Sequence, residues 1–571
     1  MRLSSSPQAA HVDGRRSKMK QAPHNKEEFT VPIFHTFPEY LEGIARLYGP
    51  RPALSWFTRR KEEKTLTYTE LTDKVAALRK VLWQKALPQG THIGIVSENS
   101  ADWIIVALAV ISCGHVAVCV DTEQSDDSIR DMIQRSDAKY LFLSGTFLPI
   151  CQPLLQNRQV EGIILMGGKS TEEGISSLDD LYVSGAALEA PNIQATREQT
   201  AEIVFTSGTT SKSKMVMLSQ GAIIQNMCDT GTYVRLYERV FCSLPFYHAY
   251  GFNTAVLNSF LRGCHLYING DLKTTMRDLQ LSAPDSMLTV PLMMEAIHNQ
   301  LWLGVEKAGK ADSLKKLIHV ASVCKKFHLP VKFKTFDSLR EKICGSLRLI
   351  ICGGAHLSKE IAEEFELLGI QVLQGYGITE CCPLISVNCN YANKLGSVGL
   401  PLPTMEIRIV DEEVCARGPS VMQGYYKNPQ ETAEVLSEDG WFKTGDLGYL
   451  DKDGFLYLTG RKKNLIVFKN GKKVSPEKLE ELISSIPMVK EVLVTGTANG
   501  VLADDVKLTA SIYPDPQRTE GLSSYEILEH LQHEVDKINN TLPTYQQIQL
   551  VNIREKEFNK TGTKKIKRYG N

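Results

Sequence analysis

The stretch Ile203-Val-Phe-Thr-Ser-Gly-Thr-Thr-Ser-Lys-Ser-Lys-Met-Val-Met-Leu-Ser219 guides the interpretation of the whole chain. Ile203 to Phe205 predict a buried strand, and Met215 to Leu218 predict a second short strand, with Ser219 as the cap of a following helix. Small or hydroxylated residues, Thr206 to Ser211, lead from the first strand into two lysines. A loop of hydroxyls and backbone N–H groups beside lysines can bind a polyphosphate.

This loop differs from the phosphate loop of nucleotide kinases. That motif needs a glycine five residues after Gly208, then lysine and a serine or threonine, and a helix begins there. Here Ser213 occupies the fifth position, and a strand is expected to follow. The stretch alone leaves two interpretations open, a polyphosphate-binding loop and an ordinary polar hairpin loop.

Length and composition limit the classes of protein to consider. A chain of 571 residues is too long for one hydrophobic core, so two or more domains are expected. The 65 basic and 65 acidic residues balance, which disfavours a general nucleic-acid binder. The 13 cysteines are scattered, with Cys381 and Cys382 adjacent and no Cys-x-x-Cys pair. This usage argues against a zinc site or a disulfide framework and favours the reducing cytoplasm.

The sequence predicts no transmembrane anchor. The longest apolar run, Ile104 to Val120, is short for a membrane span and contains serine, glycine and histidine. It predicts a buried helix, a glycine turn and a strand. Residues 1–27 are polar and lack an apolar core, which predicts a disordered leader rather than a secretory signal. Peripheral contact of a surface patch with a membrane is left open.

Residues 28–459 show alternating helix and strand patterns. Tyr68 to Leu82 is amphipathic, His92 to Ser97 predicts a strand, Asp102 to Ser112 a helix and Val116 to Val120 a strand. Repeated β-α-β units predict a large α/β domain of doubly wound sheets covered by helices. Such sheets bind ligands beyond the carboxyl ends of their strands.

Residues 460–571 have a different pattern, which predicts a small α+β domain. Gly460 to Gly471 predicts a hairpin with Asn-Gly at its turn. Ser475 to Glu477 predicts the start of a helix with serine as cap and proline at the first position. Val506 to Tyr513 predicts an alternating strand, and Ser523-x-x-Glu526 a capping box.

Four further stretches place polar groups at predicted strand ends and turns. They are Ser243–Gly251 with His248 among aromatics, Leu347–Ala355 with paired glycines, Gln374–Glu380, and Trp441–Asp446, where a β-turn ending in an exposed Asp446 carboxylate is expected. Taken singly, His248 is best interpreted as a half-buried structural histidine, and the other stretches as ordinary turns. Their joint occurrence in this order favours a functional interpretation.

Together, these motifs resemble the adenylate-forming (AMP-binding) enzymes over roughly residues 30–571. The motifs are Thr206–Ser219, Gln374–Glu380, Thr444–Asp446, Gly460–Glu480 and Lys560–Arg568. Five motifs in the right order and spacing are far more specific than any one of them. Within this superfamily the chain is most similar to bacterial long-chain fatty acyl-CoA ligases, on the basis of Gly460-Arg-Lys-Lys-Asn and the closing Lys-Lys-Ile-Lys-Arg.

The resemblance implies a large N-terminal domain, a small mobile C-terminal domain and two half-reactions. A carboxylate attacks the α-phosphate of ATP and gives acyl-AMP and pyrophosphate. A thiol, usually that of coenzyme A, then displaces AMP. Since an anion must approach a polyanion, the first step needs cations and Mg²⁺ to offset the repulsion.

The resemblance also implies roles for individual residues. The phosphates of ATP would be held by Thr206, Ser207, Gly208, Thr209, Thr210 and Lys214. Adenine would lie against Tyr376, flanked by Gly375 and Gly377, and against Gly353, Gly354 and Ala355. The remaining roles are Thr379 at the α-phosphate, Glu380 as Mg²⁺ ligand, Asp446 at the ribose hydroxyls, Arg461 near the ribose, Lys565 bridging the substrate carboxylate and α-phosphate, His248 near the acyl carboxylate, Lys463 as hinge and Gly471 at the coenzyme A channel.

The chain departs from the family pattern at several positions. Ser211, Ser213 and Met215 stand where glycine, proline and glycine are usual, and Asn559 and Lys564 replace a usual proline and glycine. A side chain in place of glycine alters how closely backbone can approach a ligand. The charged groups that the reaction needs are nevertheless present.

Three hypotheses follow. The first is an acyl-CoA ligase for a medium- or long-chain fatty acid. The second is an enzyme that adenylates another acid, such as an aryl acid, or that loads an acyl carrier protein. A free amino acid is disfavoured because Phe246 to Phe252 contains no acidic residue to hold an amine. The third is a nucleotide-binding relative without turnover.

Overall fold

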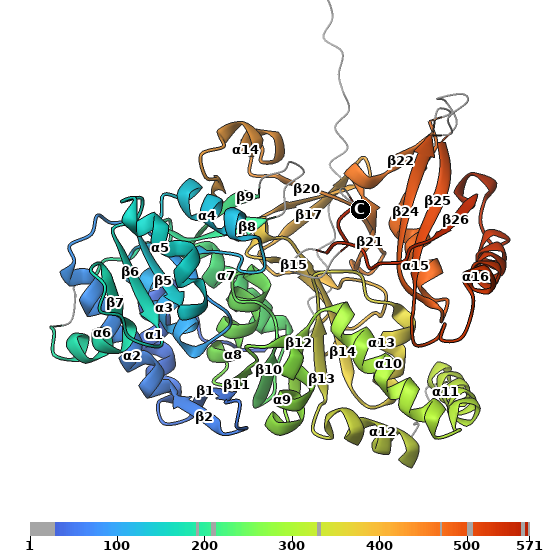
Figure 1. The fold of residues 1–571 in the computed structure, drawn as a ribbon, viewed down its shortest axis with the longest axis horizontal. Coiled ribbons are helices and arrows are strands. Elements are labelled where there is room, and N and C mark those ends of the chain that lie inside the picture. The colour runs from blue at the N-terminus through green and yellow to red at the C-terminus, as the bar shows by residue number, and fades with distance from the viewer. Residues whose placement is uncertain are drawn as a thin grey trace, which may run out of the picture.

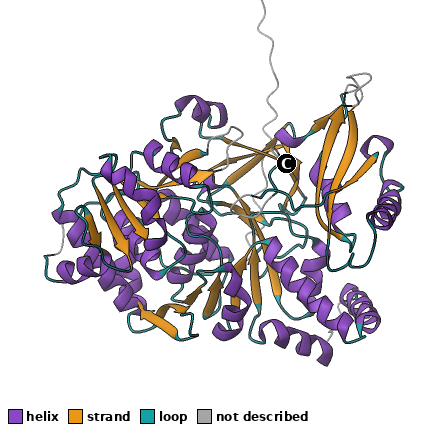
Figure 2. Ribbon diagram, in the orientation of Figure 1, coloured by secondary structure: helices purple, strands orange, loops and turns teal. Residues whose placement is uncertain are grey.

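The computed structural model describes residues 29–189, 193–206, 213–327, 333–468, 471–498, 506–560 and 566–568. The predicted leader, residues 1–27, lies outside this part of the chain. The described residues form two large mixed sheets, a four-stranded sheet and, toward the C-terminus, a two-stranded and a three-stranded sheet. Helices cover the large sheets, and the C-terminal strands stand to one side of them (Figures 1 and 2). This is the predicted α/β fold, a large N-terminal domain with a smaller C-terminal one.

The first large sheet has eight described strands in the order β19-β9-β8-β4-β3-β5-β6-β7. Its strands are β3 (His92–Val96), β4 (Val116–Cys119), β5 (Tyr140–Ser144), β6 (Gly162–Met166), β7 (Ile175–Ser177), β8 (Thr200–Thr206), β9 (Lys214–Ser219) and β19 (Gly424–Tyr425). Helices accompanying it are α2 (Tyr68–Gln84), α3 (Ala101–Ser112), α4 (Asp126–Arg135), η1 (Gly145–Phe147), α5 (Leu148–Gln156) and α6 (Leu178–Ala186). The strands from β8 to β7 pair in parallel, whereas β9 pairs antiparallel with β8 and with β19.

The second large sheet has nine described strands in the order β16-β15-β14-β13-β12-β10-β11-β1-β2. Its strands are β1 (Pro52–Phe57), β2 (Glu63–Thr67), β10 (Arg239–Cys242), β11 (His265–Ile268), β12 (Ser286–Thr289), β13 (Leu349–Cys352), β14 (Gln371–Gly377), β15 (Leu384–Val387) and β16 (Leu400–Pro401). Helices of this region are α1 (Phe37–Tyr48), α7 (Gln220–Tyr233), the π-helix η2 (Tyr250–Val256), α8 (Leu257–Leu261), η3 (Leu272–Thr274), α9 (Thr275–Ser282), α10 (Pro291–Lys307), α11 (Ala311–Lys326), α12 (Lys334–Cys344), α13 (Lys359–Leu367) and η4 (Thr379–Cys381).

The remaining elements lie toward the C-terminus. The four-stranded sheet runs β17-β18-β20-β21, and the three-stranded sheet runs β24-β25-β26. The bounds are β17 (Glu406–Val410), β18 (Glu413–Arg417), α14 (Pro429–Val435), β20 (Phe442–Leu450), β21 (Leu456–Arg461), η5 (Lys462–Asn464), β22 (Ile466–Val467), β23 (Lys473–Val474), α15 (Pro476–Ser484), β24 (Val489–Ala498), β25 (Val506–Pro514), α16 (Ser524–Asn539), η6 (Thr544–Gln546) and β26 (Leu550–Ile553).

The main core lies between the two large sheets. Alternate residues of β8 belong to different core clusters: Val204 packs in the cluster shared with the second sheet, while Ile203 and Phe205 face the cluster that includes α4 and α5. Both faces of β8 are therefore buried, as expected for a doubly wound sheet. Helix α3 is buried on nearly every side, which explains its continuous apolar sequence. Helices α7 and α8 lie between the sheets (Figure 1).

Most predicted elements are present, with local differences. The apolar run forms α3 and β4, joined through Gly114 at a φ of +81°. Arg461 ends β21, so the C-terminal hairpin is only the shorter pair β22 and β23. Ser475 precedes α15, but its hydroxyl donates to Glu477 and does not cap the helix. Within the described residues, every helix is too short or too polar to cross a bilayer.

The capping box of α16 gives a direct stability test. The Ser523 hydroxyl accepts from the Glu526 amide, and the Glu526 carboxylate accepts from the Ser523 amide. We expect Ser523→Ala to lower the free energy of unfolding of the C-terminal region by about 0.5–2 kcal/mol, because an orphan amide loses its partner. Chemical denaturation of the full chain measures this, with the exposed neighbour Ser524→Ala as control. Equal effects of both substitutions would contradict the prediction.

Candidate active site

A buried carboxylate, Asp446, is the centre of the candidate site. Its side chain lies in β20 and the residue is 5% exposed. The Tyr376 hydroxyl donates to Oδ2 at 2.7 Å, and Nε of Arg461 donates to Oδ1 at 2.6 Å. Both oxygens thus have partners, as a buried charge requires. Since Tyr376 lies on β14 and Arg461 on β21, the carboxylate links the nine-stranded sheet to the four-stranded sheet.

The prediction of an exposed carboxylate at Asp446 was wrong. Thr444 to Asp446 continue β20, where Asp446 pairs with Arg461 across the ladder. Gly445 has a φ of +71°, a conformation that favours glycine, and its amide donates to Glu413 Oε1 at 3.0 Å. The Thr444 hydroxyl accepts from the Asp446 amide at 3.1 Å. This local geometry turns the carboxylate inward, toward Tyr376.

The turn that carries Thr379 and Glu380 depends on a close backbone approach. A Cβ atom on Gly377 would lie 2.0 Å from the carbonyl oxygen of Pro383, so only glycine fits there. The Ile378 amide donates to the same oxygen at 2.9 Å. Thr379 and Glu380 then follow in η4, and Glu380 Oε1 accepts from the Tyr425 hydroxyl at 2.8 Å.

Three basic side chains, Lys214, Arg461 and Lys463, lie in the region of the Asp446 and Glu380 carboxylates. Lys214 Nζ lies 3.2 Å from Glu431 and 4.5 Å from the centre of the Tyr425 ring. The pKa of Lys463 is lowered, first by partial burial and then by the positive charges of Arg461 and Lys214. Lys463 therefore lies near enough to Arg461 and Lys214 for their charges to act on it, and the Asp446 carboxylate opposes them in part. Two of these cations are ion-paired, Lys214 with Glu431 and Arg461 with Asp446.

The paired glycines follow β13 and lie beside β14. A Cβ on Gly353 would lie 3.3 Å from the Gly375 carbonyl oxygen and 3.4 Å from the Tyr250 ring. Gly354 has a φ of +85°, and Ala355 is exposed. The structure thus brings the Gly353–Ala355 segment next to Gly375 and Tyr376, as the predicted adenine site requires.

His248 has the half-buried position that its ordinary structural interpretation predicts. Its ring centre lies 4.8 Å from that of Tyr247, and η2 begins two residues later. The Tyr250 hydroxyl donates to the carbonyl oxygens of Thr289 at 3.2 Å and Ile351 at 3.1 Å. Because the Tyr250 ring also faces Gly353, the His248 segment borders the glycine segment. Its predicted role near an acyl carboxylate stays a prediction.

Several predicted residues lie outside the described part of the chain: Ser207, Gly208, Thr209, Thr210 and Lys565. The ends of the predicted phosphate loop are described, because Thr206 pairs with Lys214 across the β8–β9 ladder. Of the departures from the family pattern, Met215 is a buried core residue. Ser213 accepts from Arg135 through its carbonyl oxygen at 3.0 Å and its hydroxyl at 3.1 Å.

The predicted hinge and channel residues occupy connecting segments. Lys463 lies in η5 directly after β21. Gly471, between β22 and β23, has a φ of +78°, and a Cβ added to it would meet no described atom within 4 Å. Close to the closing motif, Arg568 donates to Glu480 at 2.5 Å and Lys560 pairs with Glu491. The proposed motions and contacts of Lys463 and Gly471 stay predictions.

Sequence reasoning missed two residues, Tyr425 and Arg135. Tyr425 donates to Glu380 and lies under Lys214, because β19 adds to the edge of β9. Arg135, at the end of α4, fixes Ser213 next to the predicted phosphate loop. Neither residue has a local sequence signal, since both contacts depend on segments far apart in the chain.

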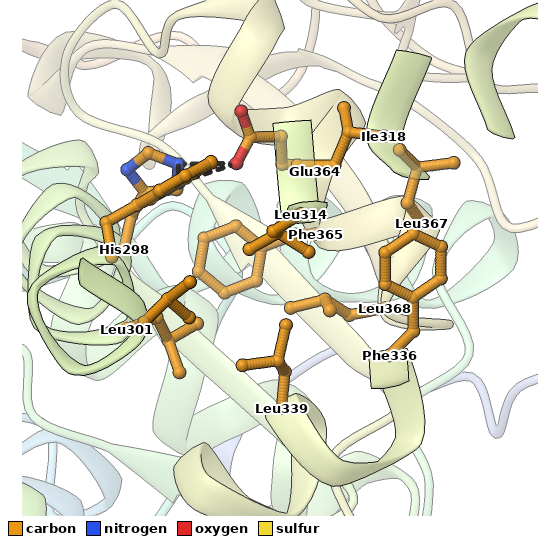
Figure 3. A pocket seen from close by; sticks show the side chains of 12 residues that line it. His298, Leu301, Leu314, Ile318, Phe336, Leu339, Glu364, Phe365, Leu367 and Leu368 are labelled. Atoms are coloured by element: carbon orange, nitrogen blue, oxygen red, sulfur yellow. Dashed lines mark hydrogen bonds and ion pairs between the residues drawn. The ribbon is translucent and has the colours of Figure 1, made fainter. Parts of the chain in front are cut away.

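A cavity elsewhere in the described residues is too small to be the ligand site. It lies among α10, α11, α12 and α13, and at its edge His298 Nε2 lies 2.8 Å from a carboxylate oxygen of Glu364 (Figure 3). Its volume is about 30 Å³, and its walls are mostly leucine, isoleucine, valine and phenylalanine. Ligand pockets usually measure roughly 300–1,000 Å³, so this space is too small for an acyl chain.

Tyr376→Phe tests the central contact. The change removes the hydroxyl that donates to the buried Asp446 carboxylate. We expect the free energy of unfolding to fall by about 1–3 kcal/mol, because a buried charge loses one of its side-chain partners. Tyr449→Phe, at a 51% exposed position on β20, is the matched control and should change little. Unfolding free energies that do not differ between the two variants would contradict the assignment.

Comparison with known proteins identifies the family. A model of the AMP-binding enzyme family matches residues 41–426, and one of the AMP-binding enzyme C-terminal domain matches residues 463–569. Long-chain-fatty-acid–CoA ligase FadD15 of Mycobacterium bovis is 28% identical over 491 residues, covering 80% of this chain and 78% of its own. Long-chain-fatty-acid–[acyl-carrier-protein] ligase AEE15 of Arabidopsis thaliana is 24% identical over 582 residues, covering 86% and 78%.

The fold has solved counterparts. The crystal structure of the anthranilate CoA ligase AuaEII with anthranoyl-AMP superposes with a TM-score of 0.76 at 19% identity, covering 94% of this chain and 96% of that one. At this identity the likeness concerns the fold. The first family model alone spans more than half of the sequence. The chain therefore belongs to the AMP-binding enzyme family, the adenylate-forming superfamily that its motifs predict.

Proposed function

We propose that the protein activates a medium- or long-chain fatty acid with ATP, forming acyl-AMP and pyrophosphate, and then transfers the acyl group to coenzyme A. The observation that carries this proposal is the junction at Asp446, where Tyr376 and Arg461 meet beside Lys214 and Lys463. It offers a carboxylate for ribose hydroxyls, an aromatic face for adenine and cations for phosphates.

The cations would lower the electrostatic barrier to the first step. A substrate carboxylate must approach the negatively charged α-phosphate, and the repulsion falls when positive charge is already fixed nearby. Lys214 would supply this charge from the N-terminal domain, and Arg461 from the start of the C-terminal domain. Lys565, which lies outside the described residues, would add a compact positive charge between the carboxylate and the α-phosphate.

Glu380 fits a magnesium ion that arrives with ATP. Its carboxylate is half-buried, and one oxygen, Oε1, is held by Tyr425. A fixed carboxylate is the hard oxygen ligand that Mg²⁺ prefers, with phosphate oxygens and water as further ligands. When bound, the ion would neutralise phosphate charge. Tyr425 orients Glu380, and Thr379 on the same turn would contact the α-phosphate.

Domain movement would separate the two steps. We propose domain limits of 28–459 and 460–571, with the small domain turning about Lys463. In one orientation it would bring Lys565 to the nucleotide, and in the other it would bring the Gly471 hairpin to the thiol channel. The position of Lys463 directly after β21 supports this assignment.

Relatives and sequence together favour a fatty acid. Two relatives, at 28% and 24% identity, carry names of long-chain-fatty-acid ligases, and Phe246 to Phe252 contains no acidic side chain that could hold an amino group. A carrier-protein acceptor is the second candidate, because one relative is named as an acyl-carrier-protein ligase. We propose a cytoplasmic location, which suits the free cysteines of the described residues.

The proposal is tested by measuring AMP and pyrophosphate release from ATP and Mg²⁺ with a panel of carboxylic acids, with and without coenzyme A. AMP formation that requires both a fatty acid and coenzyme A is expected. Turnover only after addition of an acyl carrier protein would support the second candidate. Nucleotide binding without product across the panel would overturn both.

Lys565→Ala should separate the half-reactions. We expect acyl-AMP formation to fall by at least about 100-fold, because a charge at the reacting centre is lost. Thioester formation from supplied acyl-AMP should change little, since AMP is displaced without this lysine. Rapid-quench assays of each half-reaction measure both rates, with Lys567→Ala as the control. Normal overall turnover of Lys565→Ala would refute the assignment.

Glu380→Gln tests the metal ligand. The amide keeps the shape and can still accept from Tyr425, but it lacks the negative charge that favours Mg²⁺. We expect the Mg²⁺ concentration needed for half-maximal pyrophosphate release to rise by about tenfold or more, because one ionic ligand is lost. The control is Glu431→Gln, which alters the ion pair of Lys214 instead. An unchanged Mg²⁺ dependence for Glu380→Gln would exclude the role.

A further inference from the structure

Glu202 is a buried carboxyl group that the proposed reaction does not use. It lies on β8 and is 1% exposed. Its Oε2 accepts from Nδ2 of Asn253 at 3.0 Å, and Asn253, on η2, is 2% exposed. Two acceptor atoms of this pair, Glu202 Oε1 and Asn253 Oδ1, have no hydrogen-bond donor among the described residues.

The surroundings of Glu202 do not favour a negative charge. In the described part of the chain, the titratable groups that interact with it are the thiols of Cys119 on β4 and Cys382 after η4. Burial raises the pKa of both thiols, and Glu202 raises it further, so both are neutral. Burial likewise raises the pKa of Glu202 to about 7, and the Asn253 amide lowers it only in part.

We propose that Glu202 is protonated in the working enzyme and forms a cyclic carboxyl–amide pair with Asn253. In this arrangement, Asn253 Nδ2 donates to Glu202 Oε2, and the Glu202 hydroxyl on Oε1 donates to Asn253 Oδ1. One proton turns the orphaned Glu202 Oε1 into a donor and gives the orphaned Asn253 Oδ1 its partner. Without it, two buried acceptors stay unsatisfied and a charge is buried without a cation, which is costly.

The pair joins segments that carry the candidate site. Strand β8 ends at Thr206, where the predicted phosphate loop begins. Helix η2 begins two residues after His248. Cys382, which interacts with Glu202, follows Glu380 by two residues. Glu202 is therefore a positioning residue that fixes β8, which leads into the predicted phosphate loop, against η2, which follows His248. This catalytic role rests on the proposed function.

Ionisation of Glu202 should destabilise the fold as the pH rises. The pKa of Glu202 in the folded chain, about 7, is raised above the 4.5 of an unperturbed glutamate. The stabilisation from the neutral group is fully present below the unfolded pKa and is lost as pH rises through the folded pKa. The loss should therefore develop between about pH 4.5 and pH 7.

Glu202→Gln provides the test, because its amide imitates the protonated carboxyl and can form both hydrogen bonds with Asn253. Melting temperatures of the ligand-free full chain are measured from pH 5 to pH 9. The melting temperature of Glu202→Gln relative to wild type should rise by several degrees over this range. A constant difference would overturn the proposal. This readout needs no substrate, so it stands apart from the proposed reaction.

Activity supplies the second readout. With a fatty acid that the wild type accepts, kcat/KM for that acid should fall on the alkaline side in the wild type and fall less in Glu202→Gln. Loss of activity in Glu202→Gln at every pH would mean that an ionised Glu202 is needed, and would overturn the proposal. If no acid is turned over, the melting curves still decide it.

Infrared spectroscopy covers the case in which Glu202→Gln fails to fold. Asn253→Asp keeps the shape of the partner and replaces its donor amide with a second carboxyl, so at least one of the two carboxyls must be protonated for them to pair. The wild type at pH 6 should show the carbonyl band of a buried protonated carboxyl group, altered in Asn253→Asp. Absence of that band in the wild type would show that Glu202 is ionised and would overturn the proposal.

Discussion

The candidate site depends on one buried charge, the Asp446 carboxylate. It satisfies its two oxygens with groups from two different sheets, Tyr376 on β14 and Arg461 on β21. A buried carboxylate that lost either partner would be strongly unfavourable, so the pairing fixes how these sheets meet. Burial and the nearby carboxylate raise the pKa of Tyr376, so its hydroxyl stays protonated and keeps donating. The site is thus built into the packing of the domain.

The charge of Lys463 is disfavoured by the nearby cations Arg461 and Lys214 when no anion is bound. The pKa of Lys463 is lowered, by partial burial first and by the charges of Arg461 and Lys214, with Asp446 opposing. A bound polyphosphate would relieve this repulsion, so binding and positive charge are coupled. The neutral pair of Glu202 and Asn253 that we propose would join β8 to η2 without adding charge.

Local sequence patterns predicted the elements that depend on local rules. The apolar run of α3, the cap Ser219 and the capping box at Ser523 follow from propensity and side-chain chemistry within a few residues. The burial of Asp446 and the contacts of Tyr425 could not be predicted in this way, since they arise where distant strands meet. Roles such as that of Lys565 came from resemblance, because physical chemistry alone does not distinguish it from neighbouring lysines.

The central claim is that Asp446 recognises the ribose of a nucleotide. Calorimetric titration of AMP and of its 2′,3′-dideoxy analogue into wild type and Asp446→Asn tests it most directly. The account predicts that the wild type binds AMP at least about tenfold more tightly than the analogue, since a charged acceptor pairs with two hydroxyls. Asp446→Asn should lose most of this preference. Equal preference for AMP over the analogue in both proteins would contradict the account.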